Sequence, residues 1–378
     1  MAPTDEGTAN PQHDPARARQ YARSKLVLDI LRLALGFAFL LVFLLSGASD
    51  RLHGRFQNLT GNYYLQLSGY LIAFMAAYYV LFLGLDYYGG VVLERRYDLS
   101  NQTTAGWLAR SGKEWLLSAV LVLIAFNLFY ALIRHVPHYW WLVASVGWFV
   151  LILLLSKITP AVIVPLFYKL QPLPDRDLAA RLRALGERCG VHIKQVFEIQ
   201  LSKETKKANA AVVGLGKERR ILIGDTLTDM CSHDEIEAVF AHELGHMALH
   251  HSWKLLGAGA AFSVLVFYLL HLFLDRSAAW LGFQGAADIA ALPLLLLWVA
   301  VLGLLSRPLQ AAWSRRFEKQ ADLFVFGRTE RPEALASALD KLAGRNLADP
   351  DPHPLVEWLF YDHPPVPKRI AYLRAATP

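Results

Sequence analysis

The chain has 378 residues, of which 54% are hydrophobic and 19% charged, and its mean hydropathy is +0.30. These polar residues are too few to cover the surfaces of two or three soluble domains. The composition therefore indicates a membrane protein. The net charge of +6 does not indicate nucleic-acid binding, because the lysines and arginines form no continuous basic face with interleaved aromatic residues.

The N-terminal segment MAPTDEGTANPQHDPARARQYARSK is polar and lacks a short apolar core with a small-residue cleavage site. It is therefore not a cleaved secretory signal. We predict a disordered cytosolic tail over residues 1–25.

Six apolar runs follow, at about 26–47, 67–85, 115–133, 140–167, 255–274 and 289–305. Each approaches or exceeds the roughly 20 residues that a membrane-spanning helix needs. Six spans place both termini on one side of the membrane, and most lysines and arginines lie in the segments of that side, which indicates the cytosol. We expect a four-helix membrane region at 26–167 and two more spanning helices at 252–306.

Residues 168–251 are more polar and predict a small cytosolic α+β unit. LPDRDLAARLRALGERCG has helical periodicity that ends at Gly190, and KQVFEIQL predicts a strand. KANAAVVGLGKERRILIGDTL predicts two strands joined by a turn at 214–217. The following helix begins with Ser232 as N-cap and Glu235 three residues later, which is the pattern of a capping box.

The same helix contains the sequence HELGH, which places His242 and His246 on one face. Both imidazoles can bind one metal ion, while Glu243 can contact a water molecule on that ion without being a ligand. Two imidazoles among apolar neighbours are costly to bury unless a partner such as zinc satisfies them. We interpret the next two histidines, His250 and His251, as surface residues, because the motif constrains only the first pair.

The last segment, residues 307–378, is predicted to be cytosolic and helical. It begins with SRRFEKQADLF, in which Glu318 and Asp322 lie one helical turn apart. A catalytic zinc ion needs a third protein ligand and an open position, and Glu318 can complete a His₂Glu site. Asp322 can accept the free N–H of a ligand histidine and fix its tautomer. The sequence predicts one Zn²⁺ per chain.

HELGH and SRRFEKQAD occur here in order with ANAAVVGLG, IGDTL and HPPVPKRI. This set resembles the CAAX prenyl protease 1 family of integral-membrane zinc metallopeptidases, and we expect the chain to be a bacterial member. The resemblance covers residues 21–373, including VVLERRYDLSNQT and ITPAVIVPLFYKLQPL. It implies that His242, His246 and Glu318 bind zinc, that Glu243 is the catalytic base, and that Asp322 supports a ligand.

The resemblance also implies roles for four more residues. The strand around Asn209 and Ala210 pairs with an extended substrate, which agrees with our interpretation of KANAAVV as an edge strand. His363 and Arg369 approach the substrate, His363 near the developing oxyanion. Eukaryotic members have an additional opening membrane helix and a long insert, so we expect a less complete membrane chamber here.

The predicted fold is therefore a mainly α polytopic membrane protein with an inserted α+β metallopeptidase unit. The predicted function is zinc-dependent endopeptidase cleavage of membrane-associated polypeptides, with CAAX-type C-terminal processing implied by the resemblance. Its partners are the lipid bilayer and a peptide or protein substrate, in a bacterial cytoplasmic membrane with the active site in the cytosol.

Two alternatives remain open at this stage. One is a membrane-protein quality-control protease of the HtpX heat-shock type, which has an HExxH motif as well. The other is a non-catalytic zinc-stabilised scaffold, in which a fourth protein ligand such as His250 would close the metal site.

Overall fold

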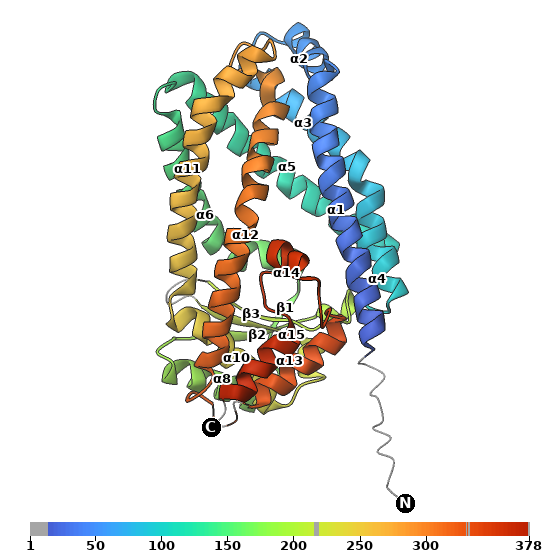
Figure 1. The fold of residues 1–378 in the computed structure, drawn as a ribbon, viewed down its shortest axis with the longest axis vertical. Coiled ribbons are helices and arrows are strands. Elements are labelled where there is room, and N and C mark those ends of the chain that lie inside the picture. The colour runs from blue at the N-terminus through green and yellow to red at the C-terminus, as the bar shows by residue number, and fades with distance from the viewer. Residues whose placement is uncertain (1–13, 215–218, 330, 332, 377–378) are drawn as a thin grey trace, which may run out of the picture.

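The computed structural model describes residues 14–214, 219–329, 331 and 333–376. Long helices occupy one end of the molecule, and the sheet with several shorter helices occupies the other (Figure 1). The start of α1 and the last helix, α15, both lie at the end that holds the sheet. The termini of the described chain are therefore on one side, as an even number of spans requires.

Among the described residues, six helical segments are long and apolar enough to cross a membrane, which confirms the predicted number. Two of them contain a π-helical turn, at Tyr88–Val92 and Thr159–Ile163. The helices of these segments are α1 (Pro15–Leu45), α3 and α4 (Tyr63–Tyr87 and Leu93–Arg96), α5 (Thr104–His135), α6 and α7 (Trp140–Ile158 and Val164–Phe167), α11 (His251–Trp280) and α12 (Leu292–Phe324). A 3-10 turn, Ile289–Ala291, leads into α12.

A short helix that we did not predict, α2 (Ala48–Leu59), joins α1 to α3 at the end far from the sheet (Figure 1). The chain turns into α2 at Gly47, whose φ of 70° is in the left-handed region that glycine adopts without strain. Ser49 on α2 is buried and donates a hydrogen bond to the Ala290 carbonyl, 2.6 Å away. This contact fixes α2 to the segment that begins the last span.

The predicted disordered tail is wrong from Pro15 onward, because α1 begins there. Asp14 caps the helix by accepting hydrogen bonds from the amides of Ala16 and Arg17. Tyr21 is buried and packs edge-on against Tyr97 with a ring separation of 5.1 Å. Packing and capping thus order this polar stretch, while residues 1–13 lie outside the described residues.

The last span does not end at the predicted boundary after residue 306, because α12 continues unbroken to Phe324. The apolar run ends near Leu305, but the helix goes on as its next turns bury Ala311, Glu318, Ala321 and Asp322. One continuous helix therefore connects the membrane region to the acidic pair near its end.

The inserted unit contains a four-stranded sheet in the order β1-β2-β4-β3. β1 (Leu170–Pro172) is antiparallel to β2 (Gln195–Ile199), β2 is parallel to β4 (Arg220–Gly224), and β3 (Ala210–Val213) is antiparallel to β4. The two predicted strands are confirmed as an antiparallel pair, with β3 at the edge of the sheet. The predicted turn at 214–217 lies, beyond Gly214, outside the described residues. The three-residue β1 was not predicted. The helices and turns of the unit are α8 (Arg176–Arg188), the 3-10 turn Leu201–Lys203, α9 (Asp225–Thr228) and α10 (His233–Ala248).

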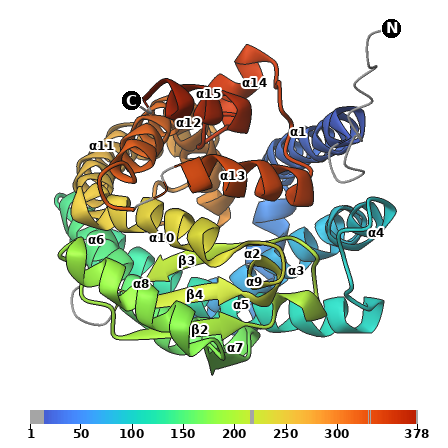
Figure 2. The same ribbon diagram turned by 90° about the horizontal axis from the view of Figure 1, so that it is seen from below.

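Three helices complete the C-terminal segment: α13 (Glu333–Asn346), α14 (Pro354–Phe360) and α15 (Val366–Ala376). α13 packs against α10 and α15, and α14 packs against α12. α10 runs beside β3 and crosses below α12, so it lies between the sheet and the C-terminal helices (Figure 2).

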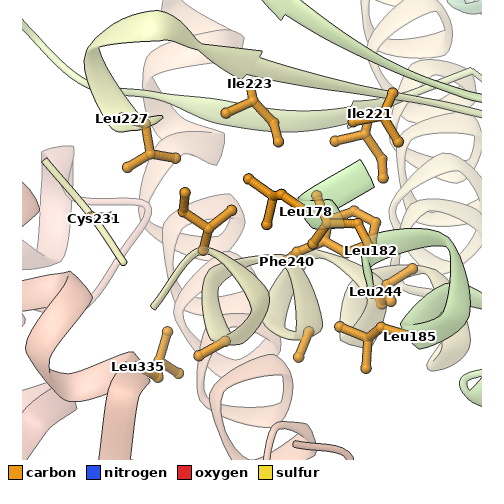
Figure 3. Close-up of a cluster of buried hydrophobic side chains, with 14 of the residues drawn as sticks. Leu178, Leu182, Leu185, Ile221, Ile223, Leu227, Cys231, Phe240, Leu244 and Leu335 are labelled. Atoms are coloured by element: carbon orange, nitrogen blue, oxygen red, sulfur yellow. The ribbon is translucent and has the colours of Figure 1, made fainter. Parts of the chain in front are cut away.

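One hydrophobic cluster joins the sheet to these helices. Each fully buried leucine contributes about 1.5–3 kcal/mol relative to an exposed one. Figure 3 shows the side chains pointing toward one another from α8, β4, α10 and α13; they are Leu178, Leu182, Leu185, Ile221, Ile223, Phe240, Leu244 and Leu335. Packing on this face of α10 fixes the rotation of the helix that carries HELGH.

Candidate metal centre

The start of α10 is fixed by the predicted capping box. The Glu235 amide donates to Ser232 Oγ at 3.3 Å, and the Ser232 amide donates to Glu235 Oε2 at 2.7 Å. The Glu235 carboxylate also accepts hydrogen bonds from Ser337 Oγ and Lys341 Nζ on α13, at 2.6 and 2.7 Å. The helix is thus capped and tied to α13 by one buried side chain.

The glycine of HELGH allows α10 and α12 to approach closely. A Cβ at Gly245 would lie 3.1 Å from both Ala321 Cα and Phe324 Cβ on α12. Ala321 itself is fully buried at this crossing. The close crossing places the acidic pair of α12 beside the two histidines of α10.

His242, His246 and Glu318 can each offer one donor atom within 4.8 Å of the other two. The two Nε2 atoms are 3.3 Å apart. His242 Nε2 is 3.4 Å from Glu318 Oε2, and His246 Nε2 is 3.2 Å from Glu318 Oε1. Two imidazole nitrogens and one carboxylate are the donor set of a three-ligand catalytic zinc site.

The spacing of these donor atoms fits a tetrahedral ion. Atoms that bind zinc at about 2.0–2.2 Å in tetrahedral geometry lie about 3.3–3.6 Å from one another. Each Nε2 lies 3.2 to 3.4 Å from the other Nε2 and from one oxygen of the Glu318 carboxylate, which is close to this range. Glu318 and His242 are also almost fully buried, with side chains 5% and 8% exposed, which is costly for groups that lack a charged partner.

Asp322 lies one turn beyond Glu318 and is fully buried. Its Oδ1 is 2.8 Å from His242 Nδ1, the ring nitrogen that faces away from the donor cluster. Arg369 donates to both carboxylate oxygens, at 2.8 and 2.6 Å, and the Tyr372 hydroxyl also donates to Oδ2. These contacts hold Asp322 in place to orient the His242 ring.

The charges around His242 oppose the effect of its burial. Burial alone lowers the pKa of the imidazole, but the adjacent carboxylates of Asp322 and Glu318 outweigh it and raise the pKa to about 9. A metal ion on Nε2 would therefore replace a proton at neutral pH, as is usual when histidine binds a metal.

Arg369 is only 7% exposed and lies behind the donor cluster, with Nη2 3.6 Å from Glu318 Oε2. In this structure the guanidinium contacts the acidic pair of α12, so the implied contact with substrate stays a prediction. His363 is more accessible, with 55% of its side chain exposed and Nδ1 2.7 Å from Glu318 Oε2. The Glu318 carboxylate raises the pKa of His363.

Glu243 is half-buried on α10, next to the first histidine. Its carboxylate has no hydrogen-bond or ion-pair partner within the described parts of the chain. A general base must be able to contact the proton that it takes, so an unengaged carboxylate beside the donor cluster suits that task.

Ala210 is the first residue of β3 and Asn209 precedes it. β3 is an edge strand of the sheet and lies beside α10 (Figure 2). The Gly224 amide donates to the Asn209 carbonyl at 2.9 Å, and Ala210 is paired with Ile223. Because hydrogen-bonded and non-hydrogen-bonded pairs alternate in an antiparallel ladder, the backbone groups of Ala210 and Val212 point away from β4. The edge of β3 can therefore accept a further extended chain.

Ala208, two residues before β3, already has a partner for its backbone N–H and C=O. Asn346 on α13 accepts from the Ala208 amide at 3.0 Å and donates to the Ala208 carbonyl at 3.1 Å. The side-chain amide thus occupies the position of a neighbouring strand at Ala208. A chain added to β3 would begin its pairing at Ala210.

The prediction that His251 is a surface residue is wrong, because its exposure is only 1%. His250 is exposed, as predicted. No sequence pattern indicates this difference, because helical periodicity does not continue through the break between α10 and α11. A left-handed His250, with a φ of 57°, turns the chain there and directs His251 toward His246.

The chain is similar in sequence to two protein families along nearly its whole length. The profile of peptidase family M48 matches residues 172–377. A profile described as the CAAX prenyl protease N-terminal region, with five membrane helices, matches residues 5–169. The two profiles meet at the boundary between the first four spans and the inserted sheet.

Individual relatives cover both regions. An uncharacterized metalloprotease of Bacillus subtilis, YhfN, is 29% identical over 97% of this chain and 89% of its own length. The CAAX prenyl protease 1 homolog of Arabidopsis thaliana is 30% identical over 76% of this chain and 68% of its own length. The CAAX prenyl protease 1 of Saccharomyces cerevisiae is 28% identical over 77% and 68%, respectively.

The fold is similar to a solved structure as well. The crystal structure of Ste24p from S. mikatae matches with a TM-score of 0.86 and 25% identity, over 97% of this chain and 91% of that one. The resemblance predicted from the motifs is thereby confirmed for both the membrane helices and the unit that holds the donor cluster.

Proposed function

Because the chain belongs to peptidase family M48 and is an integral-membrane metalloprotease of the CAAX prenyl protease 1 type, we propose that its metal is zinc. We propose His242, His246 and Glu318 as the ligands. The observation that carries the proposal is the set of separations between their donor atoms, 3.2 to 3.4 Å, which suits a tetrahedral zinc ion.

A zinc ion at this centre would supply Lewis-acid polarisation of the scissile carbonyl and would make a water molecule more acidic. Glu243 is the proposed general base: its free carboxylate takes the proton of the attacking water and then delivers it to the leaving amine. Asp322 keeps the His242 ring in the tautomer whose Nε2 lone pair faces the donor cluster.

His363 is the proposed donor to the oxyanion, because its exposed imidazole lies at the edge of the donor cluster and can turn toward a bound carbonyl. The backbone of Ala210 is proposed to pair with the substrate, since its N–H and C=O face away from β4. Asn209 precedes it with an exposed side chain. Arg369 supports Asp322, and a direct contact with substrate is part of the proposal from the family resemblance.

The proposed substrate is a polypeptide attached to or inserted in the membrane, and the proposed reaction is CAAX-type cleavage near its C-terminus. Two observations support the choice. Glu318 lies on the same continuous helix as the last span, so the donor cluster is close to the membrane region. Relatives from a plant and a yeast are named CAAX prenyl proteases.

The proposed location is a bacterial cytoplasmic membrane with the metal centre in the cytosol. The similarity to the Bacillus subtilis metalloprotease supports the first part. The excess of lysine and arginine in the segments at the sheet end supports the second.

A closed structural zinc site fits the geometry less well. The donor group among the described residues has three members, and His250 is exposed and outside that group. A structural site needs four protein ligands. The three-ligand arrangement instead leaves a position for a water molecule and a substrate oxygen.

The proposal is tested with the detergent-purified protein and two peptides of one sequence, one bare and one prenylated at its cysteine. We expect cleavage to stop on treatment with a chelator and to return on addition of zinc. The prenylated peptide should have the higher kcat/KM if the substrate carries an isoprenoid, whereas equal values would exclude isoprenoid recognition. Cleavage that persists after complete metal removal would contradict the proposed chemistry.

A further inference from the structure

The break between α10 and α11 places a third histidine, His251, against the Nδ1 side of the His246 ring. α10 ends at Ala248, and His250 adopts a left-handed conformation with a φ of 57°. Residues other than glycine pay a conformational cost for this geometry, and such residues gather at functional sites. The turn places His251, the first residue of α11, against His246.

Two contacts from α12 hold the His251 ring. It stacks on Phe317 with a centroid separation of 4.4 Å and an interplanar angle of 15°. Its Nε2 is 2.9 Å from Gln320 Oε1. Phe317 and Gln320 flank Glu318 in sequence, so the helix that supplies the third donor also fixes this ring.

The contact with Gln320 determines which ring nitrogen of His251 carries the proton. An amide oxygen only accepts hydrogen bonds, so Nε2 of His251 must be the donor. A neutral His251 then has its lone pair on Nδ1, which lies 3.1 Å from His246 Nδ1. His246 must therefore donate from Nδ1, and its own lone pair is on Nε2, the atom that faces Glu318 and His242.

We propose that His251 is a positioning residue that, together with Gln320, fixes the tautomer and the ring orientation of His246 for metal binding. The inference rests on the proposed metal site and adds a supporting group that the sequence motif does not contain. His251 orients the ring of His246 through its Nδ1, as Asp322 orients the ring of His242.

The two supports differ in charge. Asp322 is a carboxylate, held by Arg369, whereas His251 is a neutral ring held by an amide. A carboxylate behind each histidine would add a second buried negative charge next to Glu318. A neutral acceptor provides the same orientation without that charge.

Two substitutions separate this role from simple packing. His251→Phe keeps an aromatic ring to stack on Phe317 but has no acceptor, while His251→Asn loses the ring but keeps an oxygen near the position of Nδ1. The readout is zinc affinity, measured by competition with a chelator, and the visible spectrum of the cobalt-substituted protein. Thermal unfolding of each variant without metal reports folding separately.

We expect His251→Phe to lower zinc affinity by about 10–100-fold, the usual effect of removing a partner of a ligand histidine. His251→Asn should bind zinc more tightly than His251→Phe, and the matched control His250→Asn, at the exposed left-handed position, should bind like the wild type. Gln320→Leu should weaken zinc binding with His251 intact, which tests the relay even if a His251 variant does not fold.

Wild-type affinity in His251→Phe, or weaker binding in His251→Asn than in His251→Phe, would overturn the inference while leaving the proposed function intact. A wild-type protein that binds no zinc would overturn the proposed function, and the inference with it.

Discussion

Asp322 is not a proposed ligand, yet it joins three other groups of the metal centre. His242, Arg369 and Tyr372 all contact its buried carboxylate. Removing a carboxylate from such a group leaves a buried guanidinium without its partner, and this costs far more free energy than the loss of one surface ion pair. At the scale of single residues, the centre therefore depends on charges behind the ligands as well as on the ligands.

Asp322→Asn should lower the free energy of unfolding by about 3–5 kcal/mol, because Arg369 loses its buried counter-charge. It should also lower zinc affinity by about 10–100-fold, because His242 loses an anionic acceptor. Thermal unfolding and chelator competition measure the two effects. The control is Lys368→Ala, which breaks an exposed ion pair with Glu357 and should change neither quantity by more than about 1 kcal/mol. Unchanged zinc affinity in Asp322→Asn would show that Asp322 does not orient His242.

The spacing within each helix predicted that His242 and His246 share one face of α10, and that Glu318 and Asp322 share one face of α12, since residues four apart lie on the same face. The contacts of Arg369 and His251 could not be predicted in this way. Arg369 meets Asp322 from a different helix, across 47 residues of sequence. His251 meets His246 only because His250 is left-handed, and the sequence carries no glycine to signal that turn.

Two helices, α10 and α12, form the donor cluster, and their crossing is set by Gly245. Gly245→Ala should destabilise the protein by about 1–3 kcal/mol, since a Cβ 3.1 Å from the Ala321 backbone cannot be accommodated without moving a helix. Zinc affinity should fall as well, because Glu318 moves with α12. Thermal unfolding and metal titration measure both.

The matched control for Gly245→Ala is Gly257→Ala on α11, where an added Cβ meets nothing within 4 Å. Alanine is the better helix former, so this variant should be as stable as the wild type or slightly more stable. Equal effects of the two substitutions would mean that the crossing at Gly245 tolerates a side chain.

The edge of β3 gives a second prediction at the scale of elements. Ala210→Pro removes an N–H that faces away from β4, so it should raise KM several-fold and leave zinc affinity unchanged. Ala211→Pro removes an N–H of the pair with Leu222 and should instead destabilise the sheet, because proline cannot donate to the ladder. Steady-state kinetics and thermal unfolding distinguish the two. An unchanged KM in Ala210→Pro would contradict substrate pairing at this edge.

Local signals predicted some elements and missed others. The capping box at Ser232 and the apolar pattern predicted α10, and two β-rich runs predicted β3 and β4. β1 was missed because three residues following a span carry no periodicity. The continuation of α12 to Phe324 was missed because hydropathy reports the end of the apolar run, whereas helix length depends on packing against α10.

At the scale of the whole molecule, the first membrane helix is attached to the sheet through Glu94. This carboxylate, at the end of the second span, is 8% exposed. It accepts a hydrogen bond from the Tyr21 hydroxyl of α1 at 2.6 Å and pairs with Lys207 Nζ at 2.8 Å. Lys207 lies just before β3, so one buried group connects two membrane helices to the proposed substrate strand.

Glu94→Ala should lower the free energy of unfolding by about 1–3 kcal/mol, because the buried Tyr21 hydroxyl loses its charged acceptor and the partly exposed Lys207 ammonium loses its anion. KM should rise as well, since the start of β3 is held less firmly. The control is Lys25→Ala, whose ammonium is 3.6 Å from Glu94 and 40% exposed, and it should have little effect. Thermal unfolding in detergent and steady-state kinetics measure both, and equal stability of the two variants would contradict this attachment.

Composition predicted the six spans, because these follow from hydropathy summed over about 20 residues. The side of the membrane, which we inferred from the lysines and arginines, stays a prediction. The order of residues 15–25 was not predicted, because it depends on burial of Tyr21 against a loop some 75 residues away. Long-range contacts of this kind leave no periodic pattern in the sequence.

Zinc content and peptide cleavage, measured in the wild type and in Glu243→Gln, test whether the protein is a zinc peptidase with Glu243 as its base. We expect both proteins to bind one zinc ion per chain, because Glu243 is not a ligand. Cleavage of a quenched peptide should fall by about 10²–10⁴-fold in Glu243→Gln, the usual contribution of a general base. Cleavage at the wild-type rate by a zinc-loaded Glu243→Gln protein would contradict the assignment of the base and the mechanism built on it.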